Sequence, residues 1–196
     1  MTLAYRIIRS EHYEIDLVMR CLHNLSTALY RETWKPDFDF LFLLLDYTES
    51  FPATFHHPKE EDYLFEAVRL RSPESSPMLD SLCNEHAEVL DLVSELRLSL
   101  ETYIGRPVAR GWFCTAARNL AYHEREHMRR EEKTVLPLAL QVFSKDDWDE
   151  TNAAFARNSD QLLGVKRRKK FDQLFSRILR QAPPAVIFDR RKMKVA

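Results

Sequence analysis

Apolar residues recur along the chain with the period of an α-helix. In the segment of about 4–32 they lie three, four or seven positions apart, which places one apolar stripe along a single helix face. The members of this stripe are Ile8, Ile15, Val18, Leu22, Leu25 and Leu29. The letters "WKPD" end the segment, and no β-type alternation of useful length occurs in the chain. The pattern predicts an all-α protein.

Three further long helical segments follow. The second covers about 37–71, and its interior residues Pro52 and Pro58 predict a kink or break, because a proline removes a helical hydrogen bond. The third covers about 77–104, and the fourth covers about 108–142 with a bend expected near Pro137. The stripe of the third segment comprises Leu79, Leu82, Leu90, Val93, Leu96 and Leu100. Four long helices with short connections predict an antiparallel up-down four-helix bundle over residues 1–143.

Residues 144–196 are expected to form a C-terminal helical extension. A short helix of about 145–158 is predicted after Ser144, because Asp147 follows three residues later as in a capping box. A basic amphipathic helix is predicted after Gly164, and the last residues are expected to be irregular. Its apolar face carries Phe171, Leu174, Phe175 and Ile178.

Charge is distributed unevenly between the bundle and the extension. The whole chain has a formal net charge of −1, whereas residues 164–196 contain 11 Lys and Arg against 2 Asp. Such a segment can contact nucleic acid or an anionic membrane. Docking on the acidic bundle or a solvated face is favoured, and nucleic acid is not an expected partner. The apolar face is expected to pack on the bundle or against a second chain, as in a homodimer.

Cysteine use and hydropathy indicate a soluble protein of a reducing compartment. Cys21, Cys83 and Cys114 are far apart, and no CxxC pair occurs, so neither a disulfide framework nor a zinc-thiolate site is predicted. The N-terminus becomes polar too early for a signal peptide. The longest apolar run, "FLFLLL", is much shorter than a membrane span. We therefore expect a cytoplasmic protein.

Two histidine–glutamate pairs stand out on the second and fourth helical segments. Residues four apart lie on the same helix face, within reach of one bound ion. His56 with Glu60 forms one such pair, and His127 with Glu131 forms the other. Imidazole nitrogen with carboxylate oxygen suits iron or manganese better than magnesium. The spacing therefore predicts a metal site between helices.

The first and third segments each add one histidine at a matching depth. His12 lies about 20 residues before the first turn, and His86 lies about 19 residues before the third turn. The histidines of the two pairs lie about 20 residues after the corresponding turns. In an up-down bundle that rises about 1.5 Å per residue, all four histidines reach the same level. This agreement in depth is the main argument for one shared site.

A coordination count tests the case of two metal ions. Two six-coordinate ions need about twelve ligand positions. Four imidazoles, two bridging carboxylates and a bridging oxide or hydroxide occupy about ten of them. About two positions then remain open for a small molecule, as in a reactive rather than a purely structural site.

Several neighbouring residues have alternative interpretations. His57 is expected to turn about 100° away from His56, toward an outer or surface position, although the register with His57 and Glu61 as ligands remains an alternative. His123 lies one turn before His127 and is a possible seventh ligand, an outer hydrogen-bond donor or neither. Three glutamates directly precede a predicted ligand histidine, and we expect them to be solvated or to form interhelical salt bridges. They are Glu11, Glu85 and Glu126.

The order H…HxxxE…H…HxxxE on four helices, with the stretch "HHPKEEDYLF", resembles the hemerythrin HHE cation-binding family over roughly residues 4–142. The stretch "DDWDETNAAFARNSD" also resembles the tail that follows this domain in bacterial members. The resemblance implies a non-heme di-iron centre with a bridging oxo or hydroxo group, and iron is favoured over manganese or zinc. The positions that match the family's ligands are His12, His56, Glu60, His86, His127 and Glu131.

Two departures from the oxygen-carrying members refine the expected function. Those members have a second histidine where this chain has Leu82, and an Asp five residues after the last histidine, whereas this chain has Glu131 four residues after it. Both departures favour the bacterial and regulatory branch, which is linked to redox, nitric oxide or iron responses. The expected function is binding of, or reaction with, O₂, peroxide or NO.

Two other functions are alternatives. The first is a non-enzymatic iron or oxygen sensor that acts through its C-terminal helices. The second is ferritin-like iron oxidation or storage, which ranks low because that architecture uses Glu-x-x-His on two helices. The chain has this motif once, at Glu124 and His127.

Overall fold

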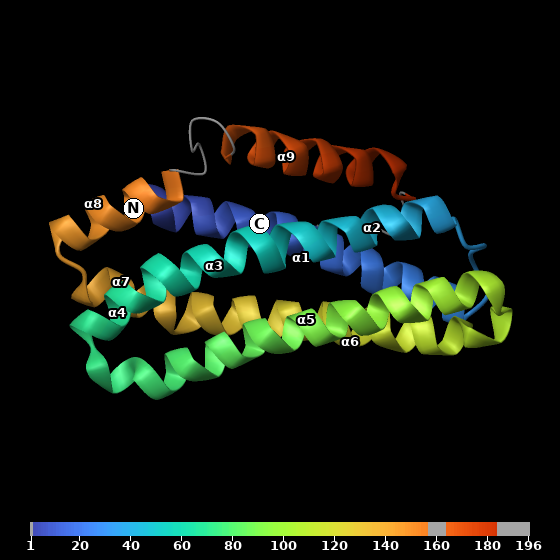
Figure 1. Ribbon diagram of the computed structural model, residues 1–196, viewed down its shortest axis with the longest axis horizontal. Helices are drawn as coiled ribbons and strands as arrows, with labels where there is room; N and C mark the ends of the chain where they lie inside the picture. The colour runs from blue at the N-terminus through green and yellow to red at the C-terminus, as the bar shows by residue number, and fades with distance from the viewer. Residues whose placement is uncertain (1, 157–163, 184–196) are drawn as a thin grey trace, which may run out of the picture.

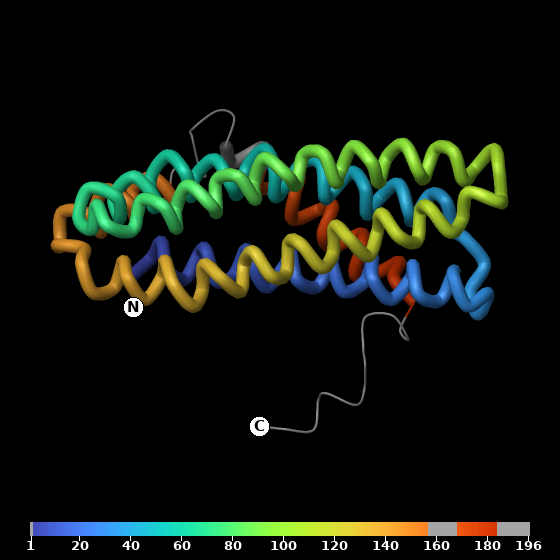
Figure 2. The backbone as a smooth tube through the Cα atoms, turned by 90° about the horizontal axis from the view of Figure 1, so that it is seen from below, coloured from blue at the N-terminus to red at the C-terminus, as the bar shows by residue number. Residues whose placement is uncertain are grey.

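The computed structural model describes residues 2–156 and 164–183, and these residues form helices without a β-strand. The bundle consists of α1 (Leu3–Tyr30), a helix over residues 38–71, α5 (Ser76–Gly105) and α6 (Arg110–Lys133). The four helices run antiparallel in chain order (Figures 1 and 2). Short turns join them, including η3 (Pro73–Ser75) and η4 (Pro107–Ala109). The predicted all-α antiparallel bundle is confirmed.

The second helix continues through both prolines by changing its hydrogen-bond pattern. It comprises α2 (Phe38–Phe51), the π-helical turn η1 (Pro52–His56), α3 (His57–Lys59), the π-helical turn η2 (Glu60–Phe65) and α4 (Glu66–Arg71). In η1, the backbone N–H of His57 donates to the carbonyl of Pro52, five residues earlier. A π-helical turn accommodates an extra residue, so it changes which side chains face the bundle interior.

The fourth helix is interrupted near Pro137, as the sequence predicts. The interruption lies at Thr134, where the backbone has φ −121° and ψ −62°. Pro137 has no N–H to donate to the carbonyl of Lys133, the residue at which α6 ends. Pro137 then lies in the first turn of α7 (Val135–Val142), where a proline is tolerated because an N–H there has no helical partner.

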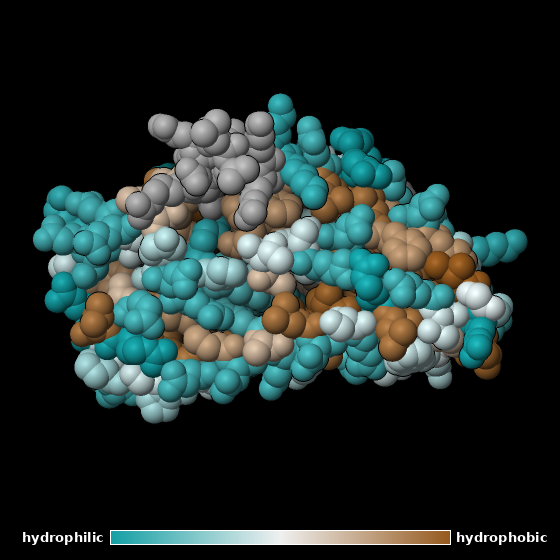
Figure 3. Space-filling view, in the orientation of Figure 1, coloured by the Kyte–Doolittle hydropathy of each residue, from teal (hydrophilic) through white to brown (hydrophobic). Residues whose placement is uncertain are grey.

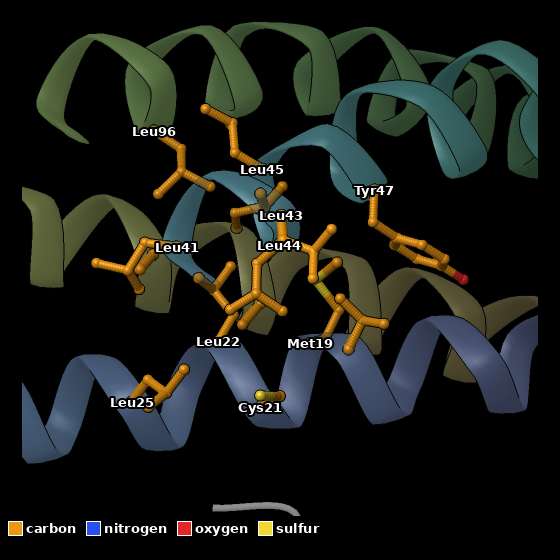
Figure 4. Close-up of a cluster of buried hydrophobic side chains, with 14 of the residues drawn as sticks. Met19, Cys21, Leu22, Leu25, Leu41, Leu43, Leu44, Leu45, Tyr47 and Leu96 are labelled. Carbon is orange, nitrogen blue, oxygen red and sulfur yellow. The ribbon is translucent and has the colours of Figure 1, made fainter. Parts of the chain in front are cut away.

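Buried apolar side chains form two clusters, and a polar layer separates them. On α1, Ile8 belongs to one cluster and Ile15 to the other, with His12 between them. On the second helix, Phe51 and Leu64 take the corresponding places on either side of the polar layer. Figure 4 shows part of the larger cluster, in which leucines of α2 meet α1 side chains. The histidines therefore lie at the common depth that the sequence predicts.

One predicted core residue of the third helix lies outside. Leu90 is 53 % exposed, and its neighbour Val89 is buried instead. Val89 lies three residues after His86 and four before Val93, which continues the inward face of α5. The error arose because a leucine was assigned to the stripe on hydrophobicity rather than on its angular position.

Two further helices pack on the bundle. α8 (Lys145–Ala156) lies along α1, where the backbone N–H of Ala4 donates to Asn152 at 2.7 Å. α9 (Gly164–Gln181) lies across α1 and α2 (Figure 1), with Phe171, Leu174 and Ile178 buried in the larger cluster. The expected apolar face of this basic helix thus covers the bundle.

The remaining expectations for the extension are only partly within the described residues. The predicted end of the short helix at about 158 and the irregular tail lie outside them, and the homodimer stays a prediction. Figure 3 shows mostly hydrophilic side chains on one face of the molecule, with apolar patches between them. Within the described residues, no helix combines the length and the hydropathy needed to cross a membrane.

The packing of the larger cluster gives a first prediction. Leu44 is fully buried, so Leu44→Ala should lower the free energy of unfolding of the metal-free protein by about 2–5 kcal/mol. Leu98 is 55 % exposed, and Leu98→Ala should change it by less than about 1 kcal/mol. Urea denaturation followed by circular dichroism measures both values. Equal losses for the two variants would contradict the assigned faces.

Candidate metal centre

Seven buried histidines and glutamates from four helices meet in the polar layer. Each is at most 5 % exposed, and their ligand atoms form overlapping groups within 4.8 Å of one another. These residues are His12, His56, His57, Glu60, His86, His127 and Glu131. The structure thus brings together all six residues that the sequence indicates as ligands, and it adds His57.

Glu60 presents one carboxylate oxygen to each side of the cluster. Its Oε1 lies 3.3 Å from Nε2 of His12 and 3.3 Å from Nε2 of His56. Its Oε2 lies 3.8 Å from Nε2 of His86. One carboxylate therefore faces two separate groups of imidazoles.

Glu131 repeats this arrangement from the opposite helix. Its Oε2 lies 3.3 Å from Nε2 of His12, while its Oε1 lies 3.3 Å from Nε2 of His127 and 3.9 Å from Nε2 of His86. Two carboxylates that each divide their oxygens between two imidazole groups can bridge two cations. The geometry therefore defines a first half around His12 and His56, and a second half around His57, His86 and His127.

The hydrogen bonding of the cluster is incomplete without a cation. Buried atoms without a hydrogen-bond partner include Nε2 of His56, both ring nitrogens of His57 and both carboxylate oxygens of Glu131. The Nε2 atoms of His86 and His127 face each other at 2.8 Å. Buried polar atoms without partners are costly, and bound cations would accept the lone pairs of the imidazole and carboxylate atoms that face them. The residues present therefore fit a metal centre.

His57 lies inside the cluster although it directly follows His56. Its ring stacks on that of His86 with centroids 4.0 Å apart, and it is 3 % exposed. The expected outward turn assumed a regular α-helix, whereas η1 and η2 flank this residue. Glu61 does not replace Glu60, since it is half-buried and accepts a hydrogen bond from His86 Nδ1 at 2.6 Å. His57 therefore joins the centre without a change of register.

His123 lies apart from the cluster. It is partly exposed, and its Nε2 is 2.9 Å from a carboxylate oxygen of Glu88. Of the possible roles considered for His123, the structure favours that of a residue outside the centre.

An outer carboxylate holds the Nδ1 atom of four of the five histidines. The bonds are Glu11–His56 at 2.9 Å, Glu61–His86 at 2.6 Å, Glu85–His127 at 2.9 Å and Glu132–His12 at 3.0 Å. A carboxylate on Nδ1 keeps the proton on that nitrogen and turns Nε2 toward the metal position. The four bonds therefore fix the orientation of these imidazoles from outside.

These outer bonds form a closed ring around the bundle. Each helix supplies its carboxylate to the histidine of the next helix in chain order, and α6 returns to α1. The carboxylate directly precedes a ligand on the first and third helices and directly follows one on the second and fourth. Neighbouring helices run in opposite directions, so a preceding residue on one helix and a following residue on the next turn in the same rotational sense around the bundle axis. The ring explains the recurrent "EH" and "EE" pairs.

The ring is only partly apparent from the sequence. Glu11 and Glu85 were expected to be solvated or to form interhelical salt bridges, and they do form them, with Lys59 and Arg130, but their bonds to the histidines were not expected. No role was expected for Glu132. Glu126, for which the same role was expected, is partly exposed and binds Arg129 of its own helix. The signal in the sequence is a carboxylate beside a ligand on all four helices. Glu124 is a further residue of the site that was not expected from the sequence. It is buried, and its Oε2 lies 3.6 Å from Nε2 of His57.

Charge within the cluster shifts several pKa values. Burial lowers the pKa of His12, but the nearby carboxylates of Glu131 and Glu60 outweigh it and raise this pKa to about 9. Burial also opposes charge on His127, yet the adjacent Glu131 carboxylate raises its pKa to about 9. Burial alone would raise the pKa of Glu131, but His127 and His12 hold it well below the usual value. Without a metal, protons on imidazole balance the carboxylates.

Metal binding is therefore expected to release protons. At pH 7.5 both His12 and His127 are positively charged in the metal-free protein, with a proton on each ring nitrogen, because their pKa values are about 9. Anaerobic ferrous iron must displace these protons, so loading should release up to about two protons per chain. Calorimetry in buffers of different ionisation enthalpy measures this number. Proton release should vanish well above pH 9. A number of released protons that does not change with pH would contradict the raised pKa values of His12 and His127.

The outer ring gives a prediction with a matched control. Glu85→Gln removes the carboxylate on His127 Nδ1 and should weaken metal binding about 10–100-fold. Glu126 also directly precedes a ligand histidine but binds Arg129, so Glu126→Gln should bind metal as the unaltered protein does. Competition with a chelator measures both affinities. Equal effects would show that position in the sequence, rather than the hydrogen bond, explains the loss.

Comparison with known proteins agrees with this geometry. The family model described as the hemerythrin HHE cation-binding domain matches residues 3–139, which include all seven residues of the centre. Among curated proteins and solved structures, none matches the chain significantly. The match covers more than half of the chain and ends within α7. The chain therefore belongs to the hemerythrin HHE cation-binding domain family.

Proposed function

We propose that the seven-residue centre holds two non-heme iron ions and binds or reacts with O₂, peroxide or NO. The observation that carries this proposal is the division of each carboxylate, Glu60 and Glu131, between two separate groups of imidazoles. A set of imidazoles and carboxylates without a thiolate favours iron over a structural zinc ion. When bound, such a centre supplies redox chemistry that protein side chains lack.

The two halves differ in the number of imidazoles. The first half has His12 and His56, while the second has His57, His86 and His127. With two bridging carboxylates and one bridge derived from solvent, six-coordinate ions would be complete in the second half and one ligand short in the first. The inclusion of His57 thus reduces the two open positions expected from the sequence to one. The first half is the proposed site of the small ligand.

The chain restricts what can reach this position. His56 and Glu60 are fully buried, and the ring of Phe51 lies parallel to that of His56 at 6.3 Å. On the second half, Phe65 stacks on His86 at 5.8 Å. Apolar walls of this kind exclude water and favour ligands of two or a few atoms. The residues of the chain would hold the metal ions and enclose the position of the small ligand. The outer carboxylates keep the imidazoles directed inward.

His57 provides a fifth imidazole. The oxygen-carrying members have a second histidine on the third helix, which this chain lacks. The position expected for it is occupied by Leu82, which is buried in the smaller apolar cluster. His57 reaches the same ligand group from a different helix. This change of donor supports the proposed assignment to the bacterial and regulatory branch, in which the ligand is sensed or consumed.

Iron analysis tests the proposal. Protein purified without added metal should contain about two irons per chain, and its near-ultraviolet absorption should change on reduction and on addition of O₂, peroxide or NO. His57→Ala should lower the iron content toward one per chain, because the second half then keeps only two imidazoles. His123→Ala, which removes a histidine outside the cluster, should leave both measurements unchanged. Absence of stoichiometric iron would overturn the proposal.

A further inference from the structure

The outer carboxylate of Glu11 differs from the other three in its burial. The side chain of Glu11 is 1 % exposed, whereas those of Glu85, Glu132 and Glu61 are 17 %, 29 % and 40 % exposed. Its Oε2 accepts a hydrogen bond from His56 Nδ1 at 2.9 Å. The other three carboxylates can be solvated in part, so protein groups must take the place of water around Glu11.

Two cations surround this carboxylate. Lys59 Nζ donates to both of its oxygens at 3.0 Å. Arg168 of α9 donates from one terminal nitrogen to Glu11 Oε1 at 3.3 Å and from the other to Glu14 Oε1 at 2.7 Å. The α9 helix therefore reaches, through one carboxylate, a histidine of the metal centre.

The position of Arg168 is fixed from several sides. Its Nε lies 2.8 Å from a carboxylate oxygen of Asp172, one turn later on α9, as an ion pair. Its guanidinium lies 5.3 Å from the ring centre of Phe51, the same ring that stacks parallel to His56. A guanidinium held by three carboxylates and an aromatic face has little freedom to turn away.

Apolar contacts place α9 on the segment that carries His56. The ring of Phe171 lies 5.1 Å from that of Phe51 and 5.1 Å from that of Phe55. Phe51 directly precedes η1, and Phe55 lies within it. This π-helical turn positions both His56 and His57, so α9 rests on the backbone that sets their orientation.

We propose that α9 is part of the metal centre, with Arg168 as a positioning residue that acts on His56 through Glu11. Metal binding in the first half of the centre and docking of α9 then stabilise each other. This inference rests on the proposed function, and it assigns to α9 the half in which the small ligand would bind. Coupling of two equilibria is reciprocal, so each can be measured from the other side.

Release of iron measures the coupling from the side of α9. In the full chain loaded with two irons, Arg168→Gln should make the release of one iron to a chelator about tenfold faster and leave the other unchanged. Arg168→Lys keeps a cation but cannot reach both carboxylates as a fork, so it should restore part of the loss. Arg180→Gln removes an equal charge from an exposed position of the same helix and should release iron as the unaltered protein does.

Hydrogen exchange measures the coupling from the side of the metal. Backbone amides of residues 164–181 should exchange more slowly in the iron-loaded chain than in the metal-free chain, and Arg168→Gln should remove most of this difference. Amides at the far end of the bundle, in residues 92–104 of α5, serve as the internal reference. A merely structural contact would slow exchange in both states equally.

The outcomes separate this inference from the function on which it rests. A chain that binds no metal overturns the proposed function and the coupling together. A chain with two irons, whose release and exchange are unaffected by Arg168→Gln, overturns the coupling alone. Faster release of both irons, with a loss of thermal stability, would assign Arg168 a general structural role and would also overturn it.

Discussion

The structure depends on the burial of ionisable side chains in a layer between two apolar clusters. Seven ligand-type residues lie at this depth, each at most 5 % exposed. Such a layer is costly unless its charges are paired, so it requires cations inside and hydrogen-bond partners outside. The ring of outer carboxylates meets the second need. The long apolar stripes of the helices must in turn keep the bundle closed around a layer that contributes little hydrophobic stabilisation.

The irregular second helix shows how the backbone serves this layer. A regular α-helix would direct two consecutive histidines to different sides, and only one of them could reach the centre. Pro52 and Pro58 interrupt the normal hydrogen-bond pattern, and π-helical turns lie around them. Both His56 and His57 are buried as a result. The local departure from ideal geometry thus supplies an additional imidazole without adding a helix.

The sequence predicts the fold and the inner part of the centre better than its outer part. Helical periodicity and the four matching depths identify the bundle and the six inner residues, because both follow from rise and rotation per residue. His57 was placed outward because periodicity assumes a regular helix. The partners of Glu11 and Glu85 depend on which helices are neighbours, and spacing along one helix carries no such information. The interruption at Thr134 lies three residues before Pro137 because a proline acts on the carbonyl four residues before it.

The ring of outer carboxylates also selects between two arrangements of the same helices. A four-helix bundle with short connections can wind clockwise or anticlockwise, and either hand would bury the same apolar stripes. In the opposite hand, Glu11 would turn toward the helix of His127 rather than that of His56, and every other carboxylate in the ring would face the wrong neighbour. Four hydrogen bonds beside the metal ligands therefore specify the chirality of the whole bundle, which the hydrophobic pattern alone leaves undetermined.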